Sequence, residues 1–192
     1  MGSTGESLSG GYSVAQERVI AASLELFGAH GVSATSLQMI ADAVGVTKAA
    51  VYHQFKSKDE IVIAVMASEL TALAPAVEAA EAEPDLQAAR DILLARVVDR
   101  MVTRRRLTRV LQYDPVVVRL LDEHPPFARF MGRLHGVLLG AGTDPVARVN
   151  AAVMSAALSA ALIHPLVTDV DDATLSRHIL TVGRRILVPA QS

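Results

Sequence analysis

"LQMIADAVGVTKAAVYHQFK", residues 37–56, is the stretch that decides the fold. Its spacing is typical of two short helices that meet at a steep angle across a tight turn. Such a pair needs a small residue where the two backbones approach, a residue that tolerates positive φ in the turn, and a branched apolar residue that packs back. Ala41, Gly45 and Val51 supply these three properties in order. The spacing therefore predicts a helix-turn-helix.

The rest of the chain also has the sequence pattern of successive helices. Apolar residues recur at helical spacing, and residues that cap or break helices separate the periodic segments. We expect an all-α fold of about nine helices and no sheet. Thr35 or Ser36 is expected to cap the second helix, Thr47 the third, and a capping box of Ser57 and Glu60 to open the fourth. The expected helices cover residues 14–30, 36–44, 48–54, 58–81, 85–103, 105–113, 127–139, 145–164 and 172–188.

Composition limits the classes of protein to consider. Hydrophobic residues make up 51% of the 192 residues and aromatic residues only 4%, so we expect an aliphatic core. The net charge of −2 does not favour nucleic acid by itself, so a functional basic surface has to be local. The chain has no cysteine, which excludes disulfides. The most apolar segment, 151–163, is shorter than the ~20 residues that span a bilayer, and we expect a cytoplasmic protein without a membrane partner.

The second helix of the predicted motif has two different faces. Val51 and Phe55 turn inward and complete a small core with the preceding helices. The opposite face carries Lys48, Ala49, Tyr52 and His53. In a helix-turn-helix this second helix lies in the major groove of DNA, with its first residues at the base edges. The residues therefore predict double-stranded DNA as a partner, with Lys48 donating to guanine acceptors and Ala49 permitting close approach.

Further DNA contacts are predicted at the starts of the neighbouring helices. Thr35, Ser36 and Thr47 lie where hydroxyls and free backbone N–H groups favour phosphate. Gln38 is close enough to the start of its helix to touch a base. Lys58, in the first turn of the fourth helix, opposes the helix dipole, and a phosphate beside it would reverse that penalty. A solvated surface lysine is the alternative interpretation of Lys58.

The segment "TSLQMIADAVGVTKAAVYHQFKSKDEI", residues 35–61, resembles the DNA-binding signature of TetR-family transcriptional regulators. The resemblance implies a homodimeric repressor that binds a pseudo-palindromic operator and is released by a small apolar or amphipathic effector. His53 and Gln54 depart from the family, which often has an aromatic residue and a histidine there. The Gly/Ser-rich residues 1–13 predict a disordered tail. The resemblance implies a three-helix helix-turn-helix DNA-binding domain over 14–60 and a larger helical effector-binding and dimerisation domain over 61–192.

The last two predicted helices are candidates for the dimer interface. Their apolar residues recur at three- and four-residue spacing over a broad face, and a helix that is apolar nearly all round must be buried on more than one side. Burial within the monomer is the alternative, and the family resemblance favours the dimer. The predicted interface residues are Val149, Val153, Ala156, Ala157, Ala160, His164, Leu175, Ile179, Val182 and Ile186.

The middle helices supply candidates for an effector pocket, which needs apolar walls and a few polar groups. Each candidate is, taken singly, also typical of a plain core residue. The candidates are Met101, Leu107, Leu111, Tyr113, Phe127, Phe130, Met131, Leu134, His135, Asn150 and Met154. The run "RRR", 104–106, suggests binding of a phosphate group such as that of an acyl-coenzyme A, although such a run is more often a solvated face.

Enzyme motifs are missing from the sequence, and we expect neither an enzyme nor a cofactor or metal. The six histidines form no H-E-x-x-H pair, and the chain has no nucleophile elbow, P-loop or dinucleotide fingerprint. A second hypothesis is a helical DNA-binding or partner-binding architectural protein without an effector. It predicts DNA binding that small molecules do not change.

Overall fold

The computed structural model describes residues 11–140 and 145–187, and every regular element in these residues is helical. The expected all-α fold is therefore confirmed. The first four helices are α1 (Val14–His30), α2 (Leu37–Val44), α3 (Lys48–Gln54) and α4 (Lys58–Thr71). The others are α5 (Ala74–Ala82), α6 (Leu86–Thr103), α7 (Arg105–Tyr113), α8 (Pro115–Glu123), α9 (Pro125–Leu139), α10 (Pro145–Ala161) and α11 (Asp172–Leu187), with a 3₁₀ turn, η1 (Pro165–Val167).

The described residues contain eleven α-helices, two more than the nine expected. The helix predicted over 58–81 is interrupted, because Pro75 lies in the first turn of a new helix, α5, where its missing N–H costs nothing. The expected helices leave residues 114–126 unassigned, whereas Asp114 caps α8 and Pro115 is its first residue. In both places the proline starts a helix.

Local capping explains where α1 to α4 begin. Ser13 and Gln16 form a reciprocal capping box at the start of α1. Ser36 caps α2 and Thr47 caps α3, as predicted. Ser57 caps α4, but the predicted capping box is incomplete, because Glu60 accepts from the Lys56 N–H at 2.6 Å and not from the N–H of Ser57.

The chain divides into two compact units, each described here by itself. The first comprises residues 1–72 and 106–129, and the second comprises 73–105 and 130–192. This grouping follows contacts within the chain, whereas the DNA-binding domain over 14–60 concerns function and stays a prediction. Residues 1–10 of the predicted tail lie outside the described residues.

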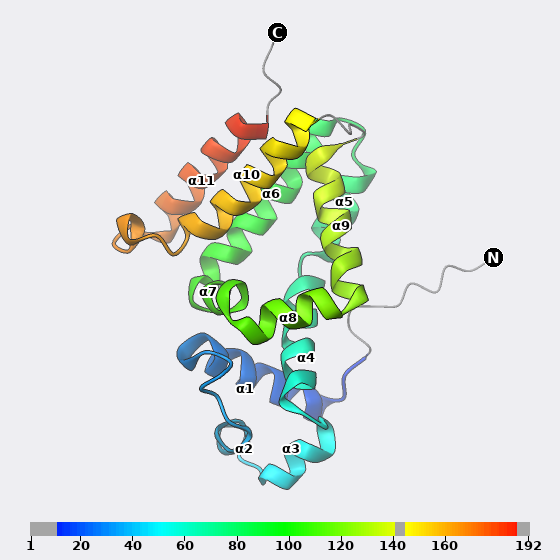
Figure 1. The fold of residues 1–192 in the computed structure, drawn as a ribbon, viewed down its shortest axis with the longest axis vertical. Coiled ribbons are helices and arrows are strands. Elements are labelled where there is room, and N and C mark those ends of the chain that lie inside the picture. Colours follow the sequence, from blue (N-terminus) through cyan, green and yellow to red (C-terminus); the bar gives the residue numbers. More distant parts are fainter. Residues whose placement is uncertain (1–10, 141–144, 188–192) are drawn as a thin grey trace, which may run out of the picture. The chain divides into compact units, whose positions relative to one another are not determined.

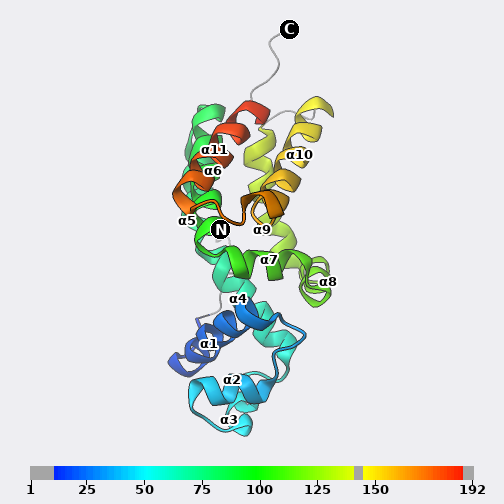
Figure 2. The ribbon, with the colours of Figure 1, turned by 90° about the vertical axis from the view of Figure 1, so that its left-hand side faces the viewer.

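The core of the first unit joins α1, α2, α3, α4 and α8. Helix α1 packs on α2, α3 and α4, and α4 packs on α8 (Figures 1 and 2). Phe27, Ile40, Val51, Ile61 and Phe127 are fully buried there. Within the short helix α3, Val51 is the one residue that this packing buries.

The second unit packs α6 against α5 and α11, and α11 against α10 (Figure 1). Arg90 of α6 is 6% exposed, and its guanidinium donates to the carbonyls of Leu138 at 2.9 Å and Leu187 at 2.8 Å. These carbonyls lie at the ends of α9 and α11, where the helix leaves them without an internal partner. Burial lowers the pKa of Arg90.

Among the described residues, no single helix has the length and hydropathy of a membrane span. Helices α4 and α5 meet these criteria only as a bent pair, by length and composition.

Candidate nucleic-acid interface

Helix α3 presents two faces of opposite character. Val51 is fully buried and Phe55, directly after the helix, is 4% exposed, so both belong to the core of the first unit. The predicted outward residues, Lys48, Ala49, Tyr52 and His53, are all exposed. The structure thus places these four side chains together on the solvent side of a seven-residue helix.

The turn before α3 has the geometry that the motif requires. Gly45 adopts φ 78° and ψ 37°, the left-handed conformation that favours glycine. Its N–H and that of Val46 both donate to the carbonyl of Ala41, at 2.9 and 3.0 Å. Ala41 is fully buried, and its methyl side chain takes little space in the core of the first unit. The angle between α2 and α3 is therefore set by main-chain hydrogen bonds.

Side chains within the exposed face also interact with one another. Lys48 Nζ lies 5.9 Å from the centre of the Tyr52 ring, a cation–π distance. Gln54 Nε2 lies 3.5 Å from Nδ1 of His53. The Lys48 contact places the ammonium charge beside the Tyr52 ring on the outward side of α3.

Thr35 and Lys58 occupy different surroundings from those predicted. Thr35 is 1% exposed, and its hydroxyl donates to the carbonyl of Gly31 at 2.7 Å. Lys58 Nζ donates to the carbonyls of Val32 and Thr35 at 3.1 and 3.3 Å. Both groups therefore bond to backbone carbonyls of the α1–α2 loop, and their contacts to DNA stay a prediction.

Ser36, Gln38 and Thr47 are exposed, as predicted. The hydroxyls of Ser36 and Thr47 accept capping bonds from Met39 and Ala50. Gln38 Nε2 donates to Asp42 Oδ1 at 2.7 Å, so its amide already has a partner on α2. Ser36 and Gln38 lie at the start of α2 and Thr47 directly precedes α3, so none of the three belongs to the outward face of α3.

Two side chains of α1 donate hydrogen bonds to the helix-turn-helix, and the sequence analysis predicted neither. Arg18 donates to the carbonyl of Val44 at 3.0 Å, and Gln16 donates to the carbonyl of Gln54 at 3.2 Å. These carbonyls end α2 and α3, where a helix leaves its acceptors unpaired. The donors are 26 and 38 residues away along the chain, so no local pattern indicated them.

The predicted pocket residues of the first unit do not surround a described cavity. Leu107 and Phe127 are buried in its core, and Tyr113 is 55% exposed, so Tyr113 does not line an enclosed space. Leu111 lies in α7, but its side chain is outside the described part of the structure.

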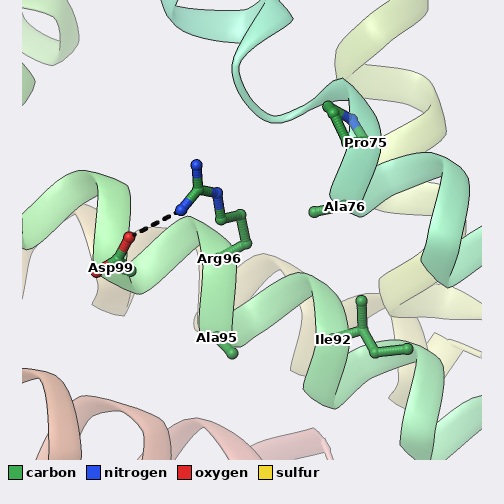
Figure 3. Close-up of a pocket in the computed structure, with 6 residues that line it drawn as sticks. All are labelled: Pro75, Ala76, Ile92, Ala95, Arg96 and Asp99. Carbon is green, nitrogen blue, oxygen red and sulfur yellow. Dashed lines mark hydrogen bonds and ion pairs between the residues drawn. The ribbon is translucent and has the colours of Figure 1, made fainter.

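The second unit holds the remaining predicted pocket residues. Phe130 and Met154 are buried, and the others are partly exposed: Met101, Met131, Leu134, His135 and Asn150. None of them lines the open groove of about 590 Å³ between α5 and α6 (Figure 3). Apolar atoms of Ile92 and Ala95 line this groove with the Arg96–Asp99 ion pair, 3.1 Å between Nη1 and Oδ2. The groove is therefore a different feature from the predicted pocket.

The middle residue of the arginine run 104–106 is engaged within the second unit. Arg105 donates to the carbonyls of Leu162, Val167 and Val170, and pairs with Asp172 at 3.5 Å. Its guanidinium is thus used to hold the connection between α10 and α11.

The predicted dimer residues divide by exposure. Val149, Val153 and Val182 are 59, 49 and 52% exposed, and Ala156, Ala160 and His164 are also exposed. Leu175 is 4% exposed and packs inside the unit, which removes it from a candidate interface. Ala157, Ile179 and Ile186 are partly buried. An apolar strip along α10, with Val182 of α11, is therefore left uncovered in the single chain.

Comparison with known proteins identifies what the N-terminal part is similar to. Residues 19–65 match the family model described as bacterial regulatory proteins, tetR family. Over 53 residues the chain is 49% identical to the HTH-type transcriptional regulator SrpR from Pseudomonas putida. This match covers 28% of the chain and only 25% of SrpR. The resemblance inferred from residues 35–61 is confirmed by these matches.

Solved structures match nearly the whole chain in fold. A putative tetR family transcription regulator from Shewanella sp. PV-4 superposes with a TM-score of 0.71 over 91% of this chain and 96% of its own, at 16% identity. The transcriptional regulator FadR from Bacillus subtilis, solved in complex with stearoyl-CoA, gives 0.69 over 92 and 99%, also at 16% identity. At these identities the likeness concerns the fold alone.

Proposed function

We propose that the protein is a DNA-binding transcriptional regulator of the tetR family, because residues 19–65 match the model of that family of bacterial regulatory proteins. One observation carries the proposal. Helix α3 buries Val51 and turns Lys48, Ala49, Tyr52 and His53 together toward solvent. A short, rigidly held helix with such a face can enter the major groove.

The proposed contacts follow from the chemistry of each exposed side chain. Lys48 donates to guanine O6 or N7, and Ala49 lies against the base edge or a thymine methyl. Tyr52 and His53 reach a phosphate or base. Ser36, Gln38 and Thr47, exposed beside this face, are the further candidates for contacts to the DNA backbone.

Affinity has to come from a local patch. Residues 1–60 contain four lysines and arginines against six aspartates and glutamates, so the segment is acidic overall. The sequence-independent attraction to phosphate is therefore expected to be weak, and base contacts carry more of the binding.

Selection of genomic DNA fragments by the purified protein tests the proposal. A discrete motif with two-fold symmetry is the expected result. Lys48→Ala should then lower discrimination at one base position by about 1–3 kcal/mol. Arg96→Ala, which removes an exposed charge from α6 in the second unit, is the control and should leave both motif and affinity unchanged. Recovery of no motif would refute sequence-specific DNA binding.

We also propose that the protein acts as a homodimer through α10 and α11. The support is the uncovered apolar strip of Val149, Val153 and Val182, which an isologous contact would bury against its own copy. Val153→Asp places a charge in the strip and should produce monomers in light scattering. Val118→Asp is the control, since Val118 is a 44% exposed valine of α8 in the first unit. Unchanged mass for Val153→Asp would refute this interface.

Regulation by a small apolar or amphipathic effector completes the proposal. Partly exposed apolar residues of α6 and α9 in the second unit, together with Asn150 of α10, support an effector site there. The fold neighbour FadR was solved with stearoyl-CoA, so a fatty acid and its coenzyme A thioester are the first compounds to try. Because Arg105 is engaged with backbone carbonyls, we expect the free acid to act without the nucleotide.

Release of the selected DNA during titration with each compound is the measurement. A regulator that represses transcription until an effector binds should lose DNA affinity, and effector affinity should fall equally when DNA is present. DNA binding that a broad panel of small molecules leaves unchanged would instead favour an architectural protein.

A further inference from the structure

The first turn of α1 is bonded to the end of α3 through one side chain. Gln16, the third residue of α1, uses both ends of its carboxamide: Nε2 donates to the Gln54 carbonyl at 3.2 Å, and Oε1 accepts from the Ser13 N–H at 3.0 Å. Gln54 is the last residue of α3, where the carbonyl groups have no donor within the helix. Gln16 therefore connects the start of α1 to the end of the helix proposed to read DNA.

An aromatic contact joins the same two places. The ring of Tyr12, just before α1, lies against the ring of Phe55, directly after α3, with the two centroids 6.4 Å apart. This separation is in the range of favourable aromatic pairs. Phe55 is 4% exposed, and Tyr12 is partly buried against the same core. A polar and an apolar contact thus hold the end of α3 against the start of α1.

We propose that Gln16 is a positioning residue for DNA binding: its carboxamide holds the end of α3 and so sets the direction of the outward face of this helix. This inference rests on the proposed DNA-binding function and adds to it a residue outside the helix-turn-helix. The role requires no contact between Gln16 and DNA.

The two hydrogen bonds explain why a glutamine suits this position. In a capping box the third helical residue only has to accept from the N–H of the N-cap residue, and glutamate does this as well as glutamine. The bond to the Gln54 carbonyl needs a donor, which an ionised carboxylate lacks. Gln16→Glu therefore keeps the capping box of α1 and removes the connection to α3.

Helix α3 is short, so contacts at its ends matter for its orientation. It spans seven residues, and an isolated helix of this length is not stable in water. Val51 anchors its middle in the core, and the Phe55 N–H donates to the Val51 carbonyl at 2.9 Å in its last turn. Loss of the Gln16 donor leaves the Gln54 carbonyl to water and lowers the population of chains in which α3 has the reading orientation. DNA affinity falls with that population.

Hydrogen exchange of the full-length protein without DNA tests the first step. In Gln16→Glu the Phe55 amide should exchange about fivefold faster, as expected for the loss of one hydrogen bond that holds the same turn. Ala15→Glu is the matched control, because it adds the same charge at an exposed position one residue earlier in α1, and its exchange should stay at the wild-type rate. Unchanged exchange in Gln16→Glu, or equal acceleration in both variants, overturns the proposal.

DNA binding tests the second step, with a duplex selected by the wild-type protein and both variants kept well below their unfolding temperatures. Gln16→Glu should bind this duplex about fivefold more weakly than Ala15→Glu. The two variants have the same net charge, so their comparison removes the added repulsion from phosphate. Equal affinities overturn the proposal. Weaker binding by Gln16→Glu with wild-type exchange would indicate a direct contact between Gln16 and DNA, and it also overturns the proposal.

Ser13→Ala separates positioning from the stability of α1. It removes the hydroxyl that accepts from the Gln16 N–H at 3.2 Å, but it keeps both side-chain bonds of Gln16, since these reach backbone atoms of Ser13 and Gln54. Loss of the cap should lower the free energy of unfolding, whereas DNA affinity should stay within about twofold of the wild-type value. An affinity loss as large as that of Gln16→Glu would show that affinity follows the stability of α1, and it overturns the proposal.

Failure of the proposed function is distinguishable from failure of this inference. If the wild-type protein selects no duplex, the DNA-binding function fails. The exchange of the Phe55 amide in Gln16→Glu and Ala15→Glu still decides whether Gln16 holds the end of α3.

Discussion

Val51→Ala should destabilise the first unit strongly, although it lies on the helix proposed to read DNA. Val51 is fully buried, and the substitution removes two methyl-sized groups worth about 0.8 kcal/mol each. The cavity left behind adds to this transfer term, for a total of about 2–3 kcal/mol. The better helix propensity of alanine offsets only a few tenths of a kcal/mol.

Val118→Ala provides the matched comparison for that experiment. It makes the same chemical change on α8 of the same unit, at a side chain that is 44% exposed. We expect less than about 0.5 kcal/mol there. Urea unfolding followed by circular dichroism at one fixed protein concentration measures both variants. Equal, small losses for the two variants would refute the assignment of Val51 to the core, and with it the orientation of α3.

Three further perturbations follow from the structure. Gly45→Ala forces a side chain into the left-handed region at φ 78° and should cost about 1–2 kcal/mol in urea unfolding; a neutral effect would contradict the turn geometry. The hydrogen bond from Arg133 is the main cause that lowers the pKa of Glu81, so the pair stabilises the fold above the ordinary glutamate pKa of about 4.3, and this contribution is lost as pH falls through the lowered value. Glu81→Gln should flatten this acid dependence of the free energy of unfolding. Parallel curves of unfolding free energy against pH for the two proteins would argue against the pairing. Arg90→Met leaves two buried helix-end carbonyls without their donor and should lower the free energy of unfolding by about 1–3 kcal/mol in urea; a stabilised variant would mean that burying the charge outweighs its bonds.

The sequence predicted the motif because its signals are local. Ser36 and Thr47 each cap a helix by accepting a hydrogen bond from the backbone N–H three residues further along the chain. Gly45 adopts a left-handed backbone conformation that other residues avoid. Burial of Val51 followed from helical spacing. Such features depend on neighbours along the chain, which a sequence displays directly.

Contacts between distant residues could not be predicted in the same way. Arg18 and Lys58 are both cations at exposed-looking helical positions, and each donates to a carbonyl 26 residues away. A backbone acceptor has no side-chain signature, so no spacing rule points to it. Leu175 shows the corresponding problem for apolar residues, because helical periodicity does not distinguish burial within a chain from burial between chains.

The side-chain donors that support the helix-turn-helix from outside residues 37–56 also determine how long a segment must be transferred to another regulator to make a chimera. A cassette cut at residues 37–56 would contain the reading helix and its turn, yet it would omit Gln16, Arg18 and Lys58. The carbonyls at the ends of its helices would then depend on hydrogen-bond donors of the recipient protein. A transplant that starts before Ser13 and continues beyond Lys58 carries its own supports, so the motif should keep its angle in a foreign regulator.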